Sequence, residues 1–555
     1  MNPLFTRHHR LLFYAFWLFL GIVQAALTEL QDDEAYYWVY SRFLDWGYFD
    51  HPPLTGLLVK MGYALFPNEL GVRLFPLLLN LLSLLIIEKL TTNKNPFLFY
   101  TIALSIAVLQ ISGFVAVPDI PLIFFTALFF LFYRNFLERT SFKNIIFLAL
   151  SIALLFYSKY HAVLIVFFTL LANPKLFKRY QIYLVGIISL ALFLPHLIWQ
   201  YQHDWVSFRY HLFESNVNKY KPSFTLDYIL GQLLLPGPIA GFIILPAAFL
   251  YNAKNQTERA LKYTMVGVYA FFLISSFRGR VEANWTSPVM VSLMVLSHQF
   301  LLEKEKWQRA LVKLLPVTLI LVLFARIIMI ADILPFKEVK LRYHAWKDWP
   351  EILNQRTGGL PVVFSNSYQR ASKYWFYSGQ TTYSQNWYKE RKNNYNFWPV
   401  EDSMLGKPYY FLDKYDLFRF RDSIKTPIGW VGYRYDSSLA SFAKINIEVS
   451  SKKIKTKAGE SIELDCFFNI PSHYAVFIRN QELLHDTTIV GVFSKYGWIK
   501  DLPVSVSLKE VVDAPRKKIT IDPQLKPGEY FLRFSIEEGE TNATHNSDKI
   551  QLQIE

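Results

Sequence analysis

The chain has 555 residues, of which 52% are hydrophobic and 18% are charged, whereas an ordinary soluble chain has about 25% charged residues. Its net charge of +14 does not predict a nucleic-acid partner, because many Lys and Arg residues lie in short loops between apolar runs, where they orient membrane helices. The single cysteine, Cys466, excludes an intrachain disulfide framework and a cysteine-rich metal site.

Most apolar residues lie between residue 11 and about residue 331, in about eleven runs of near-membrane length. The first run follows Arg7 and Arg10 without an evident small-residue cleavage site and soluble domain after it, so we expect a retained first helix. The pattern predicts a polytopic α-helical membrane domain over residues 1–334. The expected spans are 11–27, 70–88, 97–117, 121–137, 144–158, 160–173, 181–200, 226–250, 263–277, 286–302 and 310–331.

Basic residues mark every second connection between these runs. Connections rich in Lys and Arg stay in the cytoplasm, so this rule places the N-terminus in the cytoplasm and the intervening connections on the opposite face. That extracytoplasmic face then carries the loop 28–69, the turn at Pro118-Asp119, the loop 201–225, the turn 278–285 and the C-terminal region.

The first outer loop carries three consecutive carboxylates, Asp32, Asp33 and Glu34, directly after the first span. Such a cluster beside the bilayer is costly unless it faces water, a cation or a substrate. We expect a short, aromatic-rich surface helix over residues 32–46, which Asp32 or Asp33 caps and Gly47 ends. The acids are therefore either a cap at the positive end of this helix or the acids of a functional site.

Other polar residues near the ends of the spans have both a structural and a functional interpretation. Asp119, two residues before Pro121, is an N-cap or an acid of the site. Lys159 either snorkels to the interface or binds a phosphate, and Arg73 has the same two interpretations. The remaining candidates are Arg278 and Arg280, which can neutralise a phosphate; His51, a lone histidine before two prolines; Tyr160 beside Lys159; and Glu282 and Asn284, whose carboxylate and amide suit a sugar or an ordinary membrane interface.

The residues after the last span have the composition of a soluble protein. Residues 335–436 predict a mixed α/β region, with strands at 362–364 and 409–412 and a helix at 369–377. Residues 437–555 predict a small β-sandwich. Its alternating segments are 444–449, 460–468, 489–493, 504–508 and 530–536.

In order and spacing, the motifs of the membrane domain resemble the dolichyl-phosphate-mannose–protein mannosyltransferase superfamily, which includes bacterial aminoarabinose transferases. The resemblance covers roughly residues 10–300 and implies the GT-C fold. It also implies transfer of a sugar from a polyprenyl-phosphate donor to an acceptor on the outer face. The matching pieces are Asp33-Glu34 after the first span, Pro52-Pro53-Leu54, Gly71-Val72-Arg73-Leu74, Asp119 before a proline, and Ser158-Lys159.

The resemblance implies a role for several of these residues. Asp33 would be the catalytic base or the acid that orients the acceptor, with Glu34 beside it in the motif and Asp119 as the second acid. Lys159 would lie near the donor phosphate. Inversion at the anomeric carbon is implied, and no obligatory metal or other cofactor is predicted.

Two positions depart from the family pattern. Relatives often carry Lys where this chain has His51, and a histidine would hold phosphate only when protonated or through a hydrogen bond. The additional Asp32 leaves open whether Asp32 or Asp33 is the base.

We therefore expect an inverting hexosyl- or pentosyltransferase that acts on a lipid, glycan or protein acceptor. The resemblance suggests a bacterial inner membrane. The alternatives are a transporter or flippase of lipid-linked sugars, and a non-catalytic scaffold for envelope glycan assembly. A transporter should carry ionisable residues at mid-span, whereas here the charges gather at the span ends, which favours the enzyme.

Overall fold

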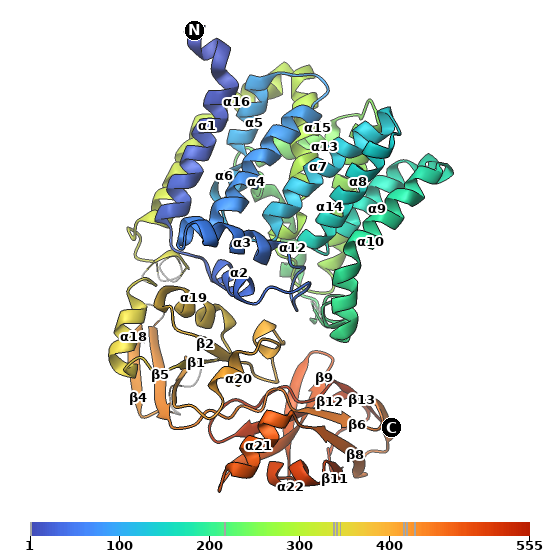
Figure 1. The fold of residues 1–555 in the computed structure, drawn as a ribbon. Helices are drawn as coiled ribbons and strands as arrows, with labels where there is room; N and C mark the ends of the chain where they lie inside the picture. Colours follow the sequence, from blue (N-terminus) through green and yellow to red (C-terminus); the bar gives the residue numbers. More distant parts are fainter. Residues whose placement is uncertain are drawn as a thin grey trace. The chain divides into compact units, whose positions relative to one another are not determined.

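The structure, a computed structural model, divides the chain into two compact units, Met1–His344 and Ala345–Glu555. The first unit is helical, and the described part of the second contains helices and three β-sheets (Figure 1). The first unit extends past the predicted boundary at residue 334, and His344 Nε2 lies 2.8 Å from the carbonyl oxygen of Ile328. The residues described are 3–215, 218–336, 339, 342–344, 346–414, 417, 420–426 and 429–555.

The helices of the first unit follow the predicted apolar runs. Among the described residues, five helices are long and apolar enough to cross a membrane, and six shorter apolar helices accompany them. This composition indicates a multi-pass membrane protein, but it does not confirm the count of eleven spans. The elements are α1 (Pro3–Leu27), α2 (Asp32–Arg42), α3 (Leu54–Leu65), α4 (Glu69–Leu90), α5 (Pro96–Ser105), α6 (Ala107–Ile111), α7 (Asp119–Glu138), α8 (Phe142–Ser158), α9 (Ala162–Ala172), η1 (Pro174–Lys178), α10 (Tyr180–Gln202), α11 (Val206–Arg209), η2 (Tyr210–Glu214), α12 (Pro222–Leu234), α13 (Gly241–Leu250), α14 (Gln256–Ser275), η3 (Ala283–Thr286), α15 (Val289–Glu303) and α16 (Glu305–Ile330).

Two expected spans are interrupted. The run 226–250 forms α12 and α13, because Pro236-Gly237-Pro238 lies between them and Gly237 has a φ of +129°, which is outside the helical range. The run 97–117 forms α5 and α6, which meet at Ile106. Near this break the side chain of Gln110 donates a hydrogen bond to the carbonyl oxygen of Leu104 at 2.7 Å, as an interrupted helix in an apolar environment requires.

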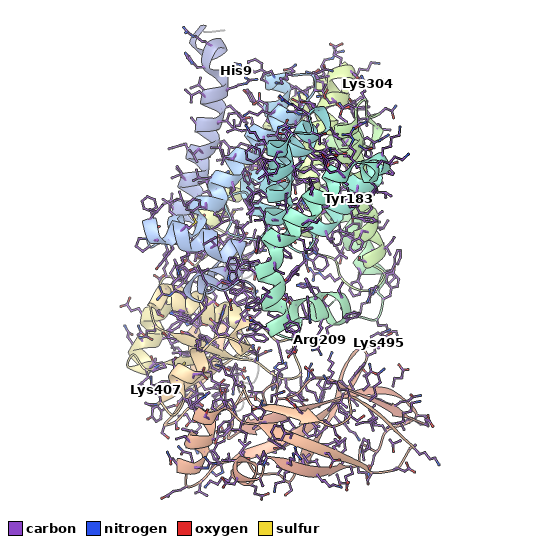
Figure 2. All side chains as sticks on the ribbon, turned by 45° about the vertical axis from the view of Figure 1, so that its right-hand side comes forward. His9, Tyr183, Arg209, Lys304, Lys407 and Lys495 are labelled. Carbon is purple, nitrogen blue, oxygen red and sulfur yellow. The ribbon has the colours of Figure 1, made fainter. Side chains whose placement is uncertain are left out.

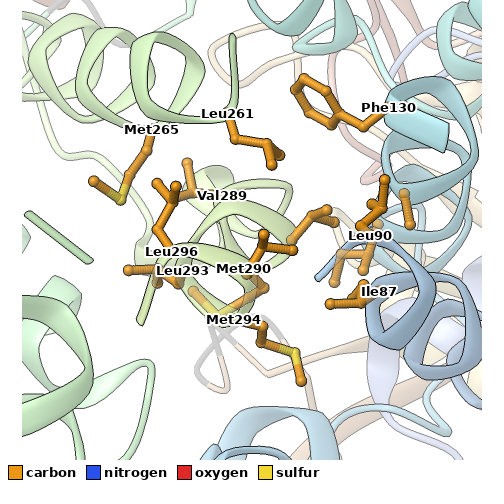
Figure 3. Close-up of a cluster of buried hydrophobic side chains, with 14 of the residues drawn as sticks. Ile87, Leu90, Phe130, Leu261, Met265, Val289, Met290, Leu293, Met294 and Leu296 are labelled. Atoms are coloured by element: carbon orange, nitrogen blue, oxygen red, sulfur yellow. The ribbon is translucent and has the colours of Figure 1, made fainter. Parts of the chain in front are cut away.

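Helix α15 forms the centre of the helical unit. Every residue from Val289 to Leu301 is buried, so this helix has no polar face turned to solvent. Figure 3 shows its Met290, Leu293 and Met294 among apolar side chains from α4, α7 and α14. Helices α7 and α8, whose ends carry Asp119 and Lys159, belong to the same apolar core.

The second unit contains a five-stranded sheet of order β2-β1-β3-β5-β4, in which β1 is parallel to β2 and β3. After it come a five-stranded sheet, β10-β9-β12-β13-β7, and a three-stranded sheet, β11-β8-β6, which contribute to one buried apolar cluster. The elements are α18 (Trp349–Thr357), β1 (Val362–Ser365), α19 (Tyr368–Ser378), β2 (Thr382–Gln385), η4 (Asn394–Asn396), α20 (Val400–Met404), β3 (Tyr409–Asp413), β4 (Asp422–Thr426), β5 (Gly429–Asp436), β6 (Asn446–Val449), β7 (Lys453–Thr456), β8 (Ile462–Asn469), α21 (Ser472–Asn480), β9 (Asp486–Ser494), β10 (Gly497–Val504), α22 (Leu508–Asp513), β11 (Arg516–Ile521), β12 (Gly528–Glu538) and β13 (Ile550–Ile554).

The expected β-rich character of this unit is confirmed, with one segment wrong. Strands and a helix form at 362–364, 409–412 and 369–377, as predicted. The segment 504–508 is not a strand, because β10 ends at Val504 and the hydroxyl of Ser507 accepts a hydrogen bond from the backbone N–H of Lys509 at the start of α22. The division of this unit at residue 436 stays a prediction.

The loop between β12 and β13 is buried and polar, and we expect Asn546 to be needed for the stability of the second unit. Its Nδ2 donates to the carbonyl oxygens of Phe442 and Ile445, both at 2.9 Å, and its Oδ1 accepts from the backbone N–H of Ile536 at 2.8 Å. Asn546→Ala leaves these buried groups unpaired, which costs about 1–3 kcal/mol for each group. Calorimetry of the full-length protein should therefore show a lower unfolding temperature for this variant. Asn480→Ala, at an exposed position, is the control, and equal unfolding temperatures would contradict the prediction.

Candidate active site

Helix α2, which carries the acid cluster, is not the surface helix predicted from the sequence. It ends at Arg42 rather than near Trp46, and all residues from Glu34 to Ser41 are buried. Its N-cap is Gln31 rather than Asp32 or Asp33, since Glu34 turns back and accepts a hydrogen bond from the backbone N–H of Gln31 at 2.9 Å. The aromatic residues of this helix thus pack inside the protein instead of marking a membrane interface.

Glu34 and Arg73 form an ion pair whose side chains are both fully buried. Arg73 Nε donates to Glu34 Oε1 at 2.7 Å, and its Nη2 donates to Glu34 Oε2 at 2.5 Å. The other three N–H groups of Arg73 donate to backbone carbonyl oxygens, so all five of its donors have partners in the protein. This geometry favours a structural role for Arg73 over contact with a donor phosphate. The carbonyl partners are those of Ala25, Thr28 and Glu29.

A cavity of about 450 Å³ lies at the start of α2. Asp33 lines it and is exposed, so its carboxylate is accessible to an incoming molecule. The wall also includes apolar residues of α6, α7 and α15 and the polar ends of several helices. Its polar lining comprises Gln31, Asp33, Glu34, Tyr37, Ser112, Asp119, His51, Lys159, Glu282, Asn284, Ser287 and Arg342.

Asp119 and Lys159 are in direct contact in the wall of this cavity. Asp119 is the first residue of α7 and Lys159 directly follows α8, so the packing of these two helices brings their ends together. Lys159 Nζ donates to both carboxylate oxygens of Asp119, at 2.9 and 3.1 Å. Asp119 also accepts hydrogen bonds from Asn284 Nδ2 at 3.1 Å and Ser287 Oγ at 2.7 Å. The carboxylate therefore fixes the position of the lysine at the cavity wall.

His51 also lines the cavity, beside Tyr37, with 5.8 Å between their ring centroids. Burial, reinforced by the nearby charge of Lys159, lowers the pKa of His51 to about 3. The histidine is consequently neutral at physiological pH. Of the two ways in which His51 was expected to hold a phosphate, this environment favours a hydrogen bond from the neutral ring.

We expect His51 to make the folded protein less stable in mild acid. The unfolded histidine gains a proton near pH 6.5, whereas the folded one stays neutral until about pH 3, so stability falls as the pH decreases between these values. His51→Gln should remove this part of the pH dependence. Thermal unfolding in detergent from pH 7.5 to 4.5 measures it, with the exposed His8→Gln as control. Parallel pH profiles for the wild type and His51→Gln would contradict the prediction.

Several predicted site residues are not among those that line the cavity. Asp32 is half-buried one residue before Asp33, and the hydroxyl of Tyr160 lies 3.2 Å from His196 Nε2. Arg278 and Arg280 are exposed, and Arg280 pairs with Glu282 at 3.1 Å. The substrate-binding roles of these residues stay predictions.

The structure adds two residues to the site that the sequence did not single out. Ser287 lies one helical turn after Asn284 on the segment that begins with η3, so both side chains reach the same carboxylate of Asp119. Arg342 lines the cavity but follows the last apolar run, in a region that the composition assigned to the soluble part of the chain. The spacing of one helical turn from Asn284 indicates Ser287, whereas no local sequence pattern indicates Arg342.

The cavity thus combines an accessible carboxylate, Asp33, with two cationic side chains, Lys159 and Arg342. A carboxylate can accept a proton from a nucleophile, and cationic groups can stabilise the negative charge of a leaving phosphate. Among the described residues, no three His, Cys, Asp or Glu side chains are grouped so that they could hold a metal ion. The predicted independence from metal stays a prediction.

Comparison with known proteins finds a family match within the first unit. Residues 50–199 match the family described as dolichyl-phosphate-mannose-protein mannosyltransferase. The chain is 24% identical over 302 residues to the lipid A galacturonosyltransferase RgtD of Rhizobium johnstonii, in a match that spans 51% of this chain and 63% of that relative.

Two solved structures of ArnT from Cupriavidus metallidurans share the fold. The apo structure is 13% identical and superposes with a TM-score of 0.57, covering 77% of this chain and 98% of ArnT. The structure bound to undecaprenyl phosphate is 14% identical, with a TM-score of 0.56 and coverage of 76% and 97%. Together with the family match, these findings confirm the resemblance, drawn from the motifs, to the mannosyltransferase/ArnT superfamily of GT-C glycosyltransferases.

Proposed function

We propose that this protein is an inverting glycosyltransferase that moves a sugar from a polyprenyl-phosphate donor to an envelope acceptor, a lipid in the first instance. The observation that carries the proposal is the cavity in which the exposed carboxylate of Asp33 shares one space with the Lys159–Asp119 pair. Two relatives support the chemistry: RgtD is a lipid A galacturonosyltransferase, and ArnT has been solved with undecaprenyl phosphate bound.

In the proposed reaction, the oxygen of the acceptor hydroxyl attacks the anomeric carbon of the sugar, and Asp33 accepts the proton of that hydroxyl. A new C–O bond forms to the acceptor while the bond from the anomeric carbon to the phosphate oxygen breaks. The lipid phosphate leaves with that electron pair, and Lys159 and Arg342 stabilise its charge. Attack on the face opposite the leaving phosphate inverts the anomeric centre.

The apolar part of the cavity wall supports a lipid-linked donor. Leu109, Ile123, Leu235 and Met290 line the cavity together with the polar groups. A site of this mixed kind can hold an isoprenoid chain against its apolar side and a phosphate against its cations. We further propose that the cavity faces the extracytoplasmic side of an inner membrane, because the basic connections of the chain fall on the alternate face.

The decisive experiment is an assay of the purified protein in detergent with a polyprenyl-phosphate sugar and candidate acceptors. Lipid A precursors are tested first, followed by glycans and proteins. A glycosyltransferase releases polyprenyl phosphate and forms a product, whereas a transporter or flippase has no compartments to connect and leaves the donor intact. If the donor stays unchanged with every acceptor but moves across the membrane of reconstituted vesicles, the protein is a transporter or flippase and the proposal is wrong.

We expect Lys159→Met to lower kcat/KM for the donor by about 100-fold, since positioned cationic or donor groups at a leaving oxyanion contribute effects of this order. Lys159→Arg should keep more activity because it retains the charge. Asp119→Asn tests whether the carboxylate acts by positioning Lys159, and it should affect the donor kinetics more than the acceptor KM. Steady-state kinetics with donor and acceptor varied separately measure these effects. Wild-type donor kinetics in Lys159→Met would exclude Lys159 from phosphate binding.

A further inference from the structure

The hairpin formed by β9 and β10 in the second unit ends in large exposed side chains. Tyr496, in the turn, is 59% exposed, and Trp498 and Ile499, at the start of β10, are 46% and 38% exposed. Lys495 lies in the same turn and is labelled in Figure 2. Exposed apolar side chains are common singly, but a contiguous group of them marks an interaction surface.

A second segment of the chain enlarges this group. Lys389 Nζ lies 3.8 Å from the centroid of the Trp498 ring and 5.7 Å from that of Trp387, which is itself 38% exposed. The lysine thus joins the two tryptophans into one surface. We call this surface the aromatic tip; it comprises Trp387, Lys389, Lys495, Tyr496, Trp498 and Ile499.

The orientation of the tip is fixed by hydrogen bonds beneath it. Asp501 accepts from Trp498 Nε1 at 2.6 Å and from Lys389 Nζ at 2.8 Å, and the hydroxyl of Tyr388 also donates to it. The strand β10 lies at the edge of its sheet, and its register with β9 shifts between Trp498 and Lys500. Ile499 is the additional residue of this bulge, so consecutive side chains of the edge strand are exposed.

These contacts favour a lipid surface over a glycan as the occupant. A sugar site needs an open aromatic face and free polar groups, but Lys389 covers one face of Trp498 and Asp501 already accepts three hydrogen bonds. Tyr, Trp and Lys are the residues that accumulate where a protein meets the headgroup region of a bilayer.

The second unit is joined to the last candidate membrane span by a short connection. Helix α16 is the last candidate span, and only residues 331–344 separate its end from the second unit. Even fully extended, such a connection reaches no more than about 50 Å. A tethered module has a high effective concentration at the surface to which it is tethered, so weak interfacial contacts are sufficient for docking.

We propose that the aromatic tip docks the second unit on the headgroup region of an anionic phospholipid bilayer, the same bilayer in which the first unit is inserted. Tyr496, Trp498 and Ile499 enter the interface, and the ammonium group of Lys495 lies at the level of the lipid phosphates, while Lys389 stays paired with Asp501 and supports Trp498. The proposal concerns a contact outside the candidate active site and does not depend on the proposed reaction.

The test uses the full-length protein in lipid nanodiscs, with an environment-sensitive fluorophore on Tyr496→Cys. The native Cys466 is buried, so the wild type serves as the labelling blank. Leu483→Cys is the matched control, because this residue is 78% exposed and lies at the other end of β9 from the turn. The length of β9 separates the two positions by about 30 Å. Spin-labelled lipids should quench the fluorophore at position 496 and not the one at position 483. Lys495→Gln should lower the ratio of docked to undocked protein by about fivefold on anionic lipid.

Three results would overturn the proposal. Quenching at position 496 by aqueous iodide but not by lipid would place the tip in water. Protection from both quenchers would mean that the tip packs against protein. If added envelope oligosaccharide protects the fluorophore at position 496 from iodide, and spin-labelled lipid does not quench it, the tip is a glycan site instead.

Discussion

Asp33→Asn is expected to reduce sugar transfer by about 1,000-fold, within the range by which a positioned general base accelerates reactions. The amide cannot accept the acceptor proton, although it has nearly the same shape as the carboxylate. Because Asp33 is exposed in the cavity and the N-cap role belongs to Gln31, the substitution should leave the fold intact. Product formation by the purified variant, at saturating donor and acceptor, measures the effect.

Asp32→Asn is the matched control for this prediction. Asp32 has the same chemistry and also lies in the first turn of α2, but it is not among the residues that line the cavity. If Asp33 is the base, Asp32→Asn keeps transfer within a few-fold of the wild type. Full activity of Asp33→Asn would refute its role, and loss of activity in Asp32→Asn alone would assign the base to Asp32.

The sequence predicted which polar residues would lie close together better than it predicted the structure around them. Asp33, Asp119 and Lys159 lie at the ends of three helices, and these positions were visible in the sequence as polar residues at the limits of apolar runs. The cavity that contains all three confirms that they converge. What each residue contacts was not visible, because ion pairs such as Lys159–Asp119 depend on which helices pack together.

Helix α2 shows why burial could not be predicted from composition. Tyr, Trp and Phe suit both a membrane interface and a protein core, so the aromatic residues of this segment supported either interpretation. The ion pair between Glu34 and Arg73 explains part of the outcome, since it links α2 to α4 inside the protein. Arg342 was missed for a related reason: the composition marks the end of the last apolar run but not the end of the compact unit.

Arg73→Met is expected to destabilise the first unit by about 3–5 kcal/mol, because it leaves the buried carboxylate of Glu34 without its cation. The variant also removes the hydrogen bonds that Arg73 donates to the end of α1 and the residues after it. Thermal unfolding in detergent, followed by size-exclusion chromatography, measures the loss. Arg309→Met is the control, because the Arg309–Glu305 pair is exposed and such pairs contribute less than about 1 kcal/mol.

The double variant Arg73→Met with Glu34→Met distinguishes a structural pair from a catalytic one. Removing both charges leaves no unpaired charge in the protein interior, so the double variant should lose less stability than the sum of the two single losses. Glu34 also accepts a hydrogen bond from the backbone N–H of Ala116 at 2.9 Å, which connects α2 to the segment that leads to Asp119. If Glu34 acts by holding this segment, Glu34→Gln lowers stability more than it lowers kcat per folded molecule. A stable Glu34→Gln that has lost transfer would instead make Glu34 a second catalytic acid and would contradict the structural role drawn from its burial.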